Sequence, residues 1–145
     1  MPEEPILILA DPNGKARDFA DKIYDKLKSH VNSKREYLFG KAEITKFNDG
    51  EIFSKILENV REKTCYFIHD SSMNPQDWLV SLALMNCALM RSSAEKINDV
   101  LPHMKYSRQD RMTEERTPIN FLKFIFTQKI LFRALLLFLC ALCFP

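Results

Sequence analysis

The sequence I-L-I-L at residues 6–9, followed by D-P-N-G at residues 11–14, decides the fold class of this chain. A short apolar run without alternating polar residues predicts a strand that is buried on both faces, as in a parallel sheet. Asp-Pro-Asn-Gly is typical of a turn, and a helix is expected over residues 15–30. Asn13 and Gly14 could cradle a phosphate at the start of that helix, but a single glycine favours a plain turn.

Apolar residues recur along the chain at two spacings, which predicts strands that alternate with helices. Steps of three and four residues predict the helix over 15–30, with Phe19 on its apolar face, and a second helix over 76–92. Asn48-Asp49-Gly50 indicates a hairpin turn, because Asp-Gly readily supplies the positive φ that a tight turn needs. The whole pattern predicts a layered α/β fold with a largely parallel sheet and a β-hairpin. Strands are expected at residues 6–9, 37–39, 42–46, 51–57, 64–68 and 97–101, with an interruption at Gly40.

Two polar pairs stand within or beside these expected strands. Asn98 and Asp99 occupy positions where a buried strand favours apolar or β-branched residues, so the last strand is expected to be weakened. His69 and Asp70 could suggest a metal or acid–base pair. Neighbours in a strand point to opposite faces, which argues against joint chemistry, and we interpret both as structural or solvent-facing.

Length and composition are those of one ordinary globular domain. The chain has 145 residues, of which 28% are charged, and its net charge of +2 is too small to indicate nucleic-acid binding. Two glutamates precede the first short apolar run, so no secretory signal peptide is expected. Cys65 and Cys87 are interpreted as buried free thiols, which favours a cytoplasmic location. Cys140 and Cys143 have redox or metal spacing, but no second pair accompanies them and chance is favoured.

Residues 106–119 read Y-S-R-Q-D-R-M-T-E-E-R-T-P-I and follow the last expected strand. Arginine side chains bind phosphate or carboxylate bidentately, and loops after strands are where open α/β sheets bind ligands. Spacing alone favours a solvated, self-paired charged loop. No aromatic platform accompanies the arginines, which makes a nucleic-acid binder a weak alternative.

Residues 47–52 read F-N-D-G-E-I and contain the expected hairpin turn. Spacing alone favours a hairpin with an ordinary polar tip. In the functional interpretation, Phe47 offers a flat face for a purine ring. The carboxylates of Asp49 and Glu51 could then accept hydrogen bonds from an adenine amino group.

Together, F-N-D-G-E-I with E-N-V-R behind it and Y-S-R-Q-D-R with R-T-P-I behind it resemble the N-terminal half of ribose-phosphate pyrophosphokinase (phosphoribosyl diphosphate synthase). The resemblance runs from about Ile6 to about Asn120. It implies a phosphoribosyltransferase-like N-terminal domain over residues 1–120, whose hairpin loop contacts the adenine of ATP bound mainly to a neighbouring subunit. A homo-oligomer, or a hetero-oligomer with a full-length synthase, is therefore expected. The residues implied to contact ATP are Phe47, Asp49, Glu51, Arg108 and Gln109.

The resemblance also implies a reaction, in which diphosphate passes from ATP to ribose 5-phosphate with the help of Mg²⁺, toward nucleotide biosynthesis. Positioning and charge neutralisation drive such transfers. The family's ribose-5-phosphate loop, metal-binding histidine segment and catalytic loop are not found in this sequence, so no catalytic residue and no metal ligand is assigned. Two predictions remain open: an ATP-contacting half of the synthase, or a non-catalytic regulatory subunit that associates with a full-length synthase.

Residues 121–145 form a hydrophobic tail that differs from the rest of the chain. The run from Ala134 to Phe144 carries no charge but is shorter than the roughly 20 residues that span a bilayer, so a membrane anchor is not the favoured interpretation. A truncated or mis-spliced reading frame is favoured. A core helix, or a helix that pairs with a partner, is the third possibility.

Overall fold

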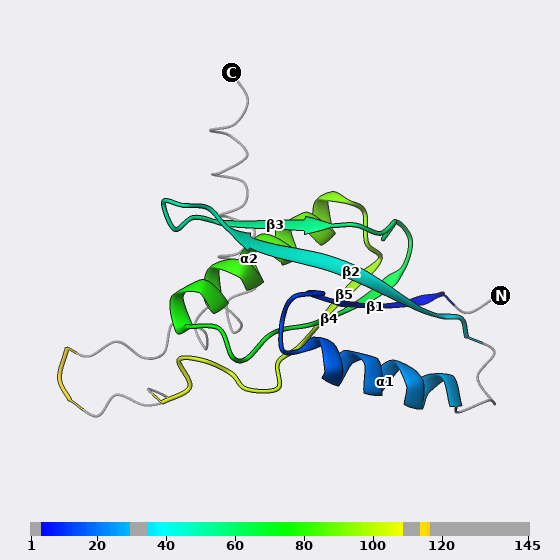
Figure 1. Cartoon of the computed structure of the whole chain (residues 1–145), viewed down its shortest axis with the longest axis horizontal. Helices are drawn as coiled ribbons and strands as arrows, with labels where there is room; N and C mark the ends of the chain where they lie inside the picture. The colour runs from blue at the N-terminus through cyan, green and yellow to red at the C-terminus, as the bar shows by residue number, and fades with distance from the viewer. Residues whose placement is uncertain (1–3, 30–34, 109–113, 117–145) are drawn as a thin grey trace, which may run out of the picture. The chain divides into compact units, whose positions relative to one another are not determined.

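The structure is a computed structural model that describes residues 4–29, 35–108 and 114–116. The chain forms two compact units, Met1–Met104 and Lys105–Pro145, and the first contains every helix and strand of the described residues (Figure 1). In chain order the elements are β1 (Ile6–Ala10), α1 (Arg17–Ser29), β2 (Tyr37–Lys46), β3 (Ile52–Ile56), β4 (Thr64–Ile68), α2 (Pro75–Arg91) and β5 (Lys96–Val100).

The five strands form one sheet in the order β3-β2-β1-β4-β5. β1 lies at the centre and pairs in parallel with β2 on one side and β4 on the other, and β5 extends the parallel part beyond β4. β3 alone is antiparallel, and it pairs with β2 across the turn at residues 47–51. The predicted α/β fold with a largely parallel sheet and a hairpin is therefore confirmed.

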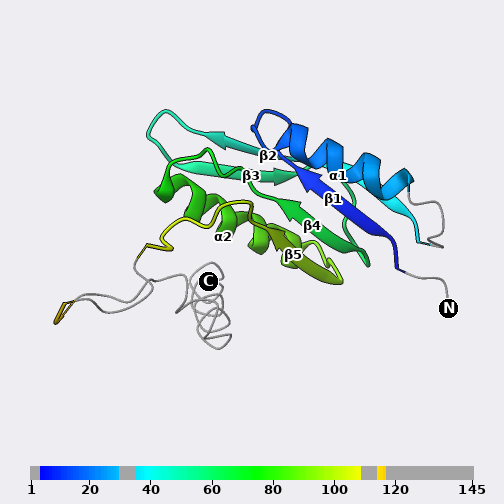
Figure 2. The same ribbon diagram turned by 90° about the horizontal axis from the view of Figure 1, so that it is seen from below.

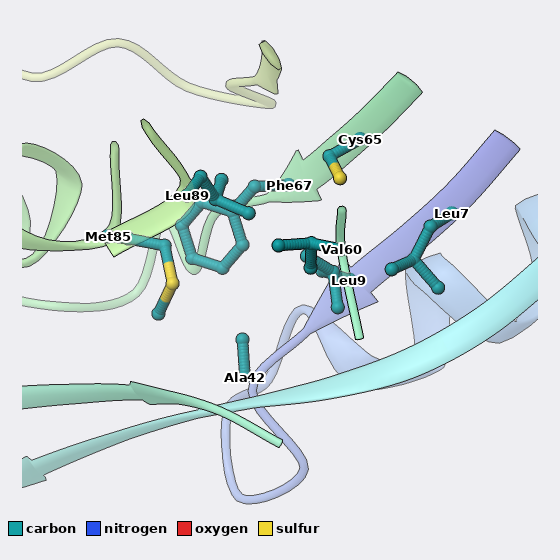
Figure 3. Close-up of a cluster of buried hydrophobic side chains, with 8 residues drawn as sticks. All are labelled: Leu7, Leu9, Ala42, Val60, Cys65, Phe67, Met85 and Leu89. Atoms are coloured by element: carbon teal, nitrogen blue, oxygen red, sulfur yellow. The ribbon is translucent and has the colours of Figure 1, made fainter. Parts of the chain in front are cut away.

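The central strand β1 is buried along its whole length, as its unbroken apolar sequence predicts. Leu7 and Leu9 belong to the core under α2, whereas Ile6 and Ile8 belong to the core under α1. Successive side chains of a strand point to opposite faces, so the two helices cover opposite faces of the sheet, as Figure 2 shows. The α2 side, drawn in Figure 3, combines Leu7, Leu9, Ala42, Val60, Cys65, Phe67, Met85 and Leu89.

The predicted interruption of the second strand at Gly40 was wrong, because β2 is continuous from Tyr37 to Lys46. Gly40 instead lies where β2 changes partners: Tyr37–Lys41 pair with β1 and Ala42–Lys46 pair with β3. A Cβ atom at residue 40 would lie 2.4 Å from Cγ of Glu58 and 3.0 Å from Cδ2 of Leu9. The glycine is therefore needed for close packing and not for a break in the strand.

The predicted helices are confirmed, with shifted ends. α2 begins at Pro75 and not at Gln76, because Asn74 caps the helix and proline fits the first helical position, where no N–H partner is needed. Phe19 was placed on the buried face of α1, but its side chain is 45% exposed. The contacts of α1 with the sheet are made instead by smaller residues, including the buried Ala16 and Ala20.

β5 forms despite the polar residues Asn98 and Asp99, and it starts one residue earlier than predicted. It lies at the edge of the sheet, where only one neighbouring strand has to be accommodated. Nδ2 of Asn86 in α2 donates to Oδ2 of Asp99 at 2.9 Å. Burial nevertheless raises the pKa of Asp99, and the Asn86 bond opposes that effect only in part.

Cys65 is buried and Cys87 is half-buried, and both are free thiols. Within the described ranges, no helix is both long and apolar enough to cross a membrane. The predicted tail at residues 121–145 and the cysteines at 140 and 143 lie outside the described residues, and the predicted division at residue 120 stays a prediction.

Candidate functional site

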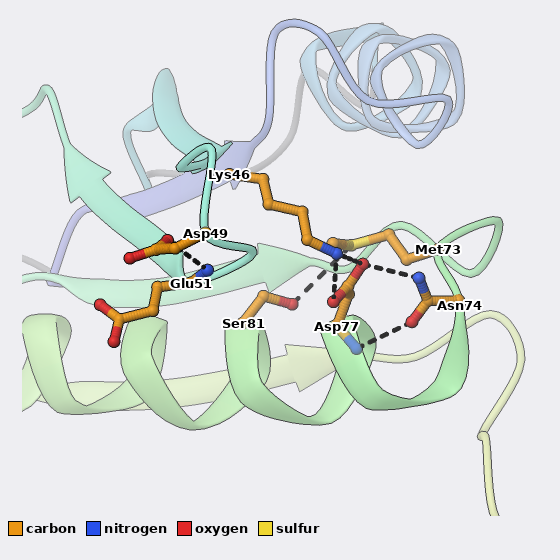
Figure 4. Close-up of polar contacts among 7 residues, drawn as sticks. All are labelled: Lys46, Asp49, Glu51, Met73, Asn74, Asp77 and Ser81. Carbon is orange, nitrogen blue, oxygen red and sulfur yellow. Dashed lines mark hydrogen bonds and ion pairs between the residues drawn. The ribbon is translucent and has the colours of Figure 1, made fainter.

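The hairpin loop brings Phe47, Asp49 and Glu51 together in one closed turn. The backbone N–H of Phe47 donates to the carbonyl of Glu51 at 2.8 Å, and the N–H of Gly50 donates to the carbonyl of Phe47 at 3.0 Å. Oδ1 of Asp49 accepts from the N–H of Glu51 at 3.0 Å (Figure 4). Gly50 has φ of +97°, a conformation that glycine adopts without strain. Among the described residues, no group donates a hydrogen bond to the carboxylate of Glu51 or to the second oxygen of Asp49, so both can bind a partner.

An aromatic pair stands beside these carboxylates. The side chain of Phe47 is 54% exposed and that of Phe53, on β3, is 46% exposed. Their ring centroids lie 5.9 Å apart with a tilt of 53° between the rings. Phe53 therefore contacts Phe47 without covering it, and sequence analysis missed this neighbour. The sequence did contain a signal for this contact. Phe53 lies two positions after Glu51, and residues two apart in a strand lie on the same face of the sheet.

Lys46 joins this loop to the start of α2. Its Nζ atom donates to both carboxylate oxygens of Asp77, at 3.0 and 2.8 Å (Figure 4). Asp77 is held in turn by Asn74, whose Nδ2 donates to it at 2.6 Å and whose Oδ1 accepts from the Asp77 N–H at 3.0 Å. The hydrogen bond from Lys46 is the main reason that the pKa of Asp77 lies below its usual value. No local sequence pattern links residues 46 and 77, so sequence analysis had no signal for this contact.

The remaining predicted ATP-contacting residues belong to the second unit. Arg108 is exposed there, and Gln109 lies outside the described residues. Glu114, Glu115 and Arg116 are exposed as well. The structure thus brings three of the five predicted residues together, and the roles of all five stay predictions.

A second candidate position, at the carboxyl ends of β1 and β4, is already filled by the protein itself. Oδ2 of Asp70 accepts from the backbone N–H of Lys15 at 2.8 Å, and Oδ1 accepts from the N–H of Ser72 at 2.7 Å. Burial acts to raise the pKa of Asp70, but these hydrogen bonds outweigh it and the pKa lies below its usual value. Burial raises the pKa of nearby Asp11, and the negative charges of Asp70 and Glu43 add to that effect. An anionic phosphate is disfavoured here, which supports the plain turn at Asn13-Gly14.

His69 and Asp70 point to opposite faces, as the alternation along a strand predicts. Asp70 reaches the start of α1, whereas His69 is fully buried against α2. The His69 ring lies 5.3 Å from the rings of Phe67 and Trp78, and Nε2 is 3.1 Å from Oγ of Ser81. Burial lowers the pKa of His69 to about 4. His69 is therefore a neutral core residue at ordinary pH, and its role is structural.

No cluster of three His, Cys, Asp or Glu side chains that could hold a metal ion occurs in the part of the chain that the structure describes. Both oxygens of Asp70 are used by backbone N–H groups, and Asp77 is used by Lys46 and Asn74. The carboxylates of Asp70 and Asp77 are therefore already engaged by groups of the protein.

Comparison with known proteins identifies a family and several relatives of this chain. Residues 13–126 match the family described as the N-terminal domain of ribose phosphate pyrophosphokinase. Over 81 residues the chain is 44% identical to a ribose-phosphate pyrophosphokinase of Mesorhizobium japonicum, covering 56% of this chain and 26% of that protein. The Bacillus subtilis protein of the same name is 41% identical over 81 residues, with the same coverage.

A solved structure gives the same result for the fold. The crystal structure of phosphoribosylpyrophosphate synthetase from Mycobacterium smegmatis matches with a TM-score of 0.63 and 27% sequence identity. The match covers 80% of this chain and 36% of that one. The chain spans about a quarter of the length of the curated relatives that it matches.

Proposed function

The chain belongs to the family of ribose phosphate pyrophosphokinase N-terminal domains, and from this premise we propose that it contacts the adenine nucleotide of a ribose-phosphate diphosphokinase. That reaction transfers diphosphate from ATP to ribose 5-phosphate and makes phosphoribosyl diphosphate for nucleotide biosynthesis. The chain is proposed to supply the ATP-contacting half. The ribose-5-phosphate and catalytic loops are assigned to no described residue.

The observation that carries this proposal is the exposed face of Phe47 beside two carboxylates in one closed turn. A purine ring can stack on the exposed part of the Phe47 side chain, since aromatic faces bind flat bases in offset geometry. An adenine amino group can then donate to Glu51 or to the free oxygen of Asp49. A guanine base held in the same orientation would present its carbonyl oxygen to these carboxylates and be repelled, so this orientation favours adenine.

Arg108 and Gln109 are proposed to contact ATP independently of this loop, with Arg108 as a cationic clamp on the polyphosphate and Gln109 as a hydrogen-bond partner of the nucleotide. Mg²⁺ would neutralise phosphate charge in such a reaction. We assign no described residue as a ligand of the ion and give it no step here.

Titration calorimetry with ATP tests the proposal, with Phe47→Ala as the main variant. Loss of a stacked base costs about 1–3 kcal/mol, so we expect the Phe47→Ala chain to bind ATP about tenfold more weakly. Phe19→Ala is a matched control, because Phe19 is also an exposed phenylalanine but lies on α1. Equal ATP affinity in the wild-type and Phe47→Ala chains, or no binding up to millimolar ATP, would contradict the proposal.

The alternative proposal is a non-catalytic subunit that associates with a full-length synthase or with further copies of itself. The exposed pair Phe47 and Phe53 favours it, because contiguous exposed aromatic side chains are typical of protein interfaces. Analytical ultracentrifugation of the chain alone and mixed with a full-length synthase distinguishes the two ideas. A complex that weakens in the Phe47→Ala/Phe53→Ala variant supports association, and a monomer in both samples excludes it.

A cytoplasmic location is part of the proposal, supported by the free thiols of Cys65 and Cys87. The division into a domain at residues 1–120 and a tail at 121–145 is likewise proposed. Proteolysis followed by mass spectrometry tests the boundary, and a protected fragment that ends well before residue 120 would contradict it.

A further inference from the structure

The residue before the proposed nucleotide loop is anchored to a different element of the fold. Lys46 is the last residue of β2, and Asp77 lies in the first turn of α2. The two residues are 31 positions apart in sequence, yet Nζ of Lys46 donates to both oxygens of the Asp77 carboxylate. Figure 4 shows the lysine side chain extending from the loop toward the start of the helix.

Asp77 is a fixed anchor. Asn74 caps the helix and exchanges two hydrogen bonds with Asp77, one to its carboxylate and one from its backbone N–H. The next residue, Trp78, is fully buried and contacts the ring of His69. Oγ of Ser81 donates to the carbonyl of Trp78 at 3.0 Å. The carboxylate therefore belongs to a helix start whose position is fixed by packing and by its cap.

The loop is held at its base by the pairing of Lys46 with Ile52 and by the contact of Phe47 with Phe53. Within the described part of the chain, its hydrogen bonds join residues 47–51 to one another, and its side chains are exposed. These internal bonds set the shape of the turn but do not set its angle relative to the helix. The ion pair from Lys46 to Asp77 is the hydrogen-bonded link that joins the end of β2 to α2.

We propose that the Lys46–Asp77 ion pair is a positioning device, which sets the angle at which Phe47, Asp49 and Glu51 are presented to the nucleotide base. This inference rests on the proposed function of the loop. The pair has a second consequence, because Asp77 neutralises the only lysine next to the loop sequence F-N-D-G-E. The Lys46 charge is thus drawn toward Asp77 and away from the loop carboxylates, which suits a base amino group and disfavours phosphate.

Three variants test the pair. Lys46→Gln and Asp77→Asn each remove one charge, and Lys46→Arg keeps the charge and can still reach the carboxylate. Because the pair is exposed, its effect is modest, and ATP binding should weaken about threefold in the two neutral variants. Lys46→Arg should stay close to wild type. Lys22→Gln, which removes an exposed lysine of α1, is the control for the change in net charge.

A ligand comparison separates positioning from a general loss of structure or charge. Inorganic tripolyphosphate carries no base, so its binding should be equal in wild type and in Lys46→Gln, whereas ATP binding should differ. If wild type binds ATP and both neutral variants bind it equally well, the inference is wrong although the proposed function survives.

The positioning role can also be tested without ATP. This matters if wild type does not bind ATP, because the proposed function then fails but the role of the ion pair is still open to test. Backbone amide NMR shifts of residues 47–51 report the position of the loop in the free chain. We expect Lys46→Gln and Asp77→Asn to move the same amide signals in the same direction, and Lys46→Arg to leave them in place. Unchanged amide signals in both neutral variants would overturn the positioning role.

Discussion

Oδ2 of Asp70, at the end of β4, accepts a hydrogen bond from the backbone N–H of Lys15 at 2.8 Å. This contact joins the carboxyl ends of two neighbouring parallel strands, at the point where the chain leaves the sheet toward opposite faces. Open α/β sheets bind ligands at such points. Here the Lys15 N–H, which could donate to a phosphate, donates to the carboxylate of Asp70 instead. Of the described positions, the hairpin loop is therefore the one best suited to a nucleotide.

Asp70→Ala should destabilise the fold, because it removes the acceptor of two partly buried hydrogen bonds, from the N–H groups of Lys15 and Ser72. A fully buried unpaired donor costs about 1–3 kcal/mol, and water can reach these two in part, so we expect a loss of about 1–2 kcal/mol in the free energy of unfolding. Urea unfolding followed by fluorescence of Trp78, the single tryptophan, measures it. Asp70→Asn keeps one acceptor oxygen and should lose less; an equal loss in both variants would contradict the two-bond explanation.

The pH dependence of stability should contain a contribution from His69. Its pKa is about 4 in the folded chain against 6.5 as the ordinary value, so the unfolded chain binds more protons between these two pH values. Stability contributed by the neutral ring is therefore fully present above pH 6.5 and is lost as the pH falls toward 4. The expected loss is about 3 kcal/mol in total.

A pH series of urea unfolding curves checks this expectation, with His69→Phe as the comparison. The Phe variant keeps an aromatic ring against Trp78 but cannot take up a proton. The difference in unfolding free energy between the two chains should change with pH only between about 4 and 6.5. Other titrating groups, such as Asp11 and Asp99 with raised pKa values, contribute to both chains and cancel. A difference that is constant with pH would contradict the prediction.

Gly40→Ala should destabilise the sheet at the point where β2 changes partners. The added Cβ would meet Cγ of Glu58 at 2.4 Å and Cδ2 of Leu9 at 3.0 Å, so both neighbours must move. Overpacking of this kind costs about 1–3 kcal/mol. Thermal unfolding of Gly40→Ala and of Gly40→Ala/Glu58→Ala separates the two contacts. We expect the double variant to recover part of the loss, and no recovery would show that the core leucines alone resist the methyl group.

Glu51→Ala should weaken ATP binding if its carboxylate accepts from the adenine amino group. Hydrogen bonds to charged groups are worth about 1.5–3 kcal/mol, so an effect of about tenfold or more on the dissociation constant is expected. GTP should bind the variant no worse than it binds wild type, because the carboxylate that repels the guanine carbonyl oxygen is gone. Calorimetry with both nucleotides measures the change. Glu95→Ala is the control, because Glu95 is also an exposed glutamate but lies between α2 and β5. Equal losses for ATP and GTP would exclude base recognition by Glu51.

Most of the fold could be predicted from the sequence by itself. The apolar run at residues 6–9 predicted a strand buried on both faces, and the Asp49-Gly50 turn predicted the hairpin, because burial and turn geometry are written into short local patterns. The steps of three and four residues likewise predicted the second helix, in which Trp78, Leu82, Met85 and Leu89 are buried. The sequence also carried the motif resemblance that singled out Phe47, Asp49 and Glu51, although spacing alone favoured an ordinary hairpin tip.

The tertiary structure alone decided which distant residues meet. It joined Asp70 to Lys15 and Lys46 to Asp77, 55 and 31 positions apart, and it left Phe19 exposed while small alanines faced the sheet. It also showed that Gly40, where an interruption of the strand was expected, lies in a continuous strand and is closely packed by its neighbours. The physical reason is that periodicity records how deeply a residue is buried, but a hydrogen bond or a tight contact depends on both partners. The second partner is fixed only when the strands and helices have packed.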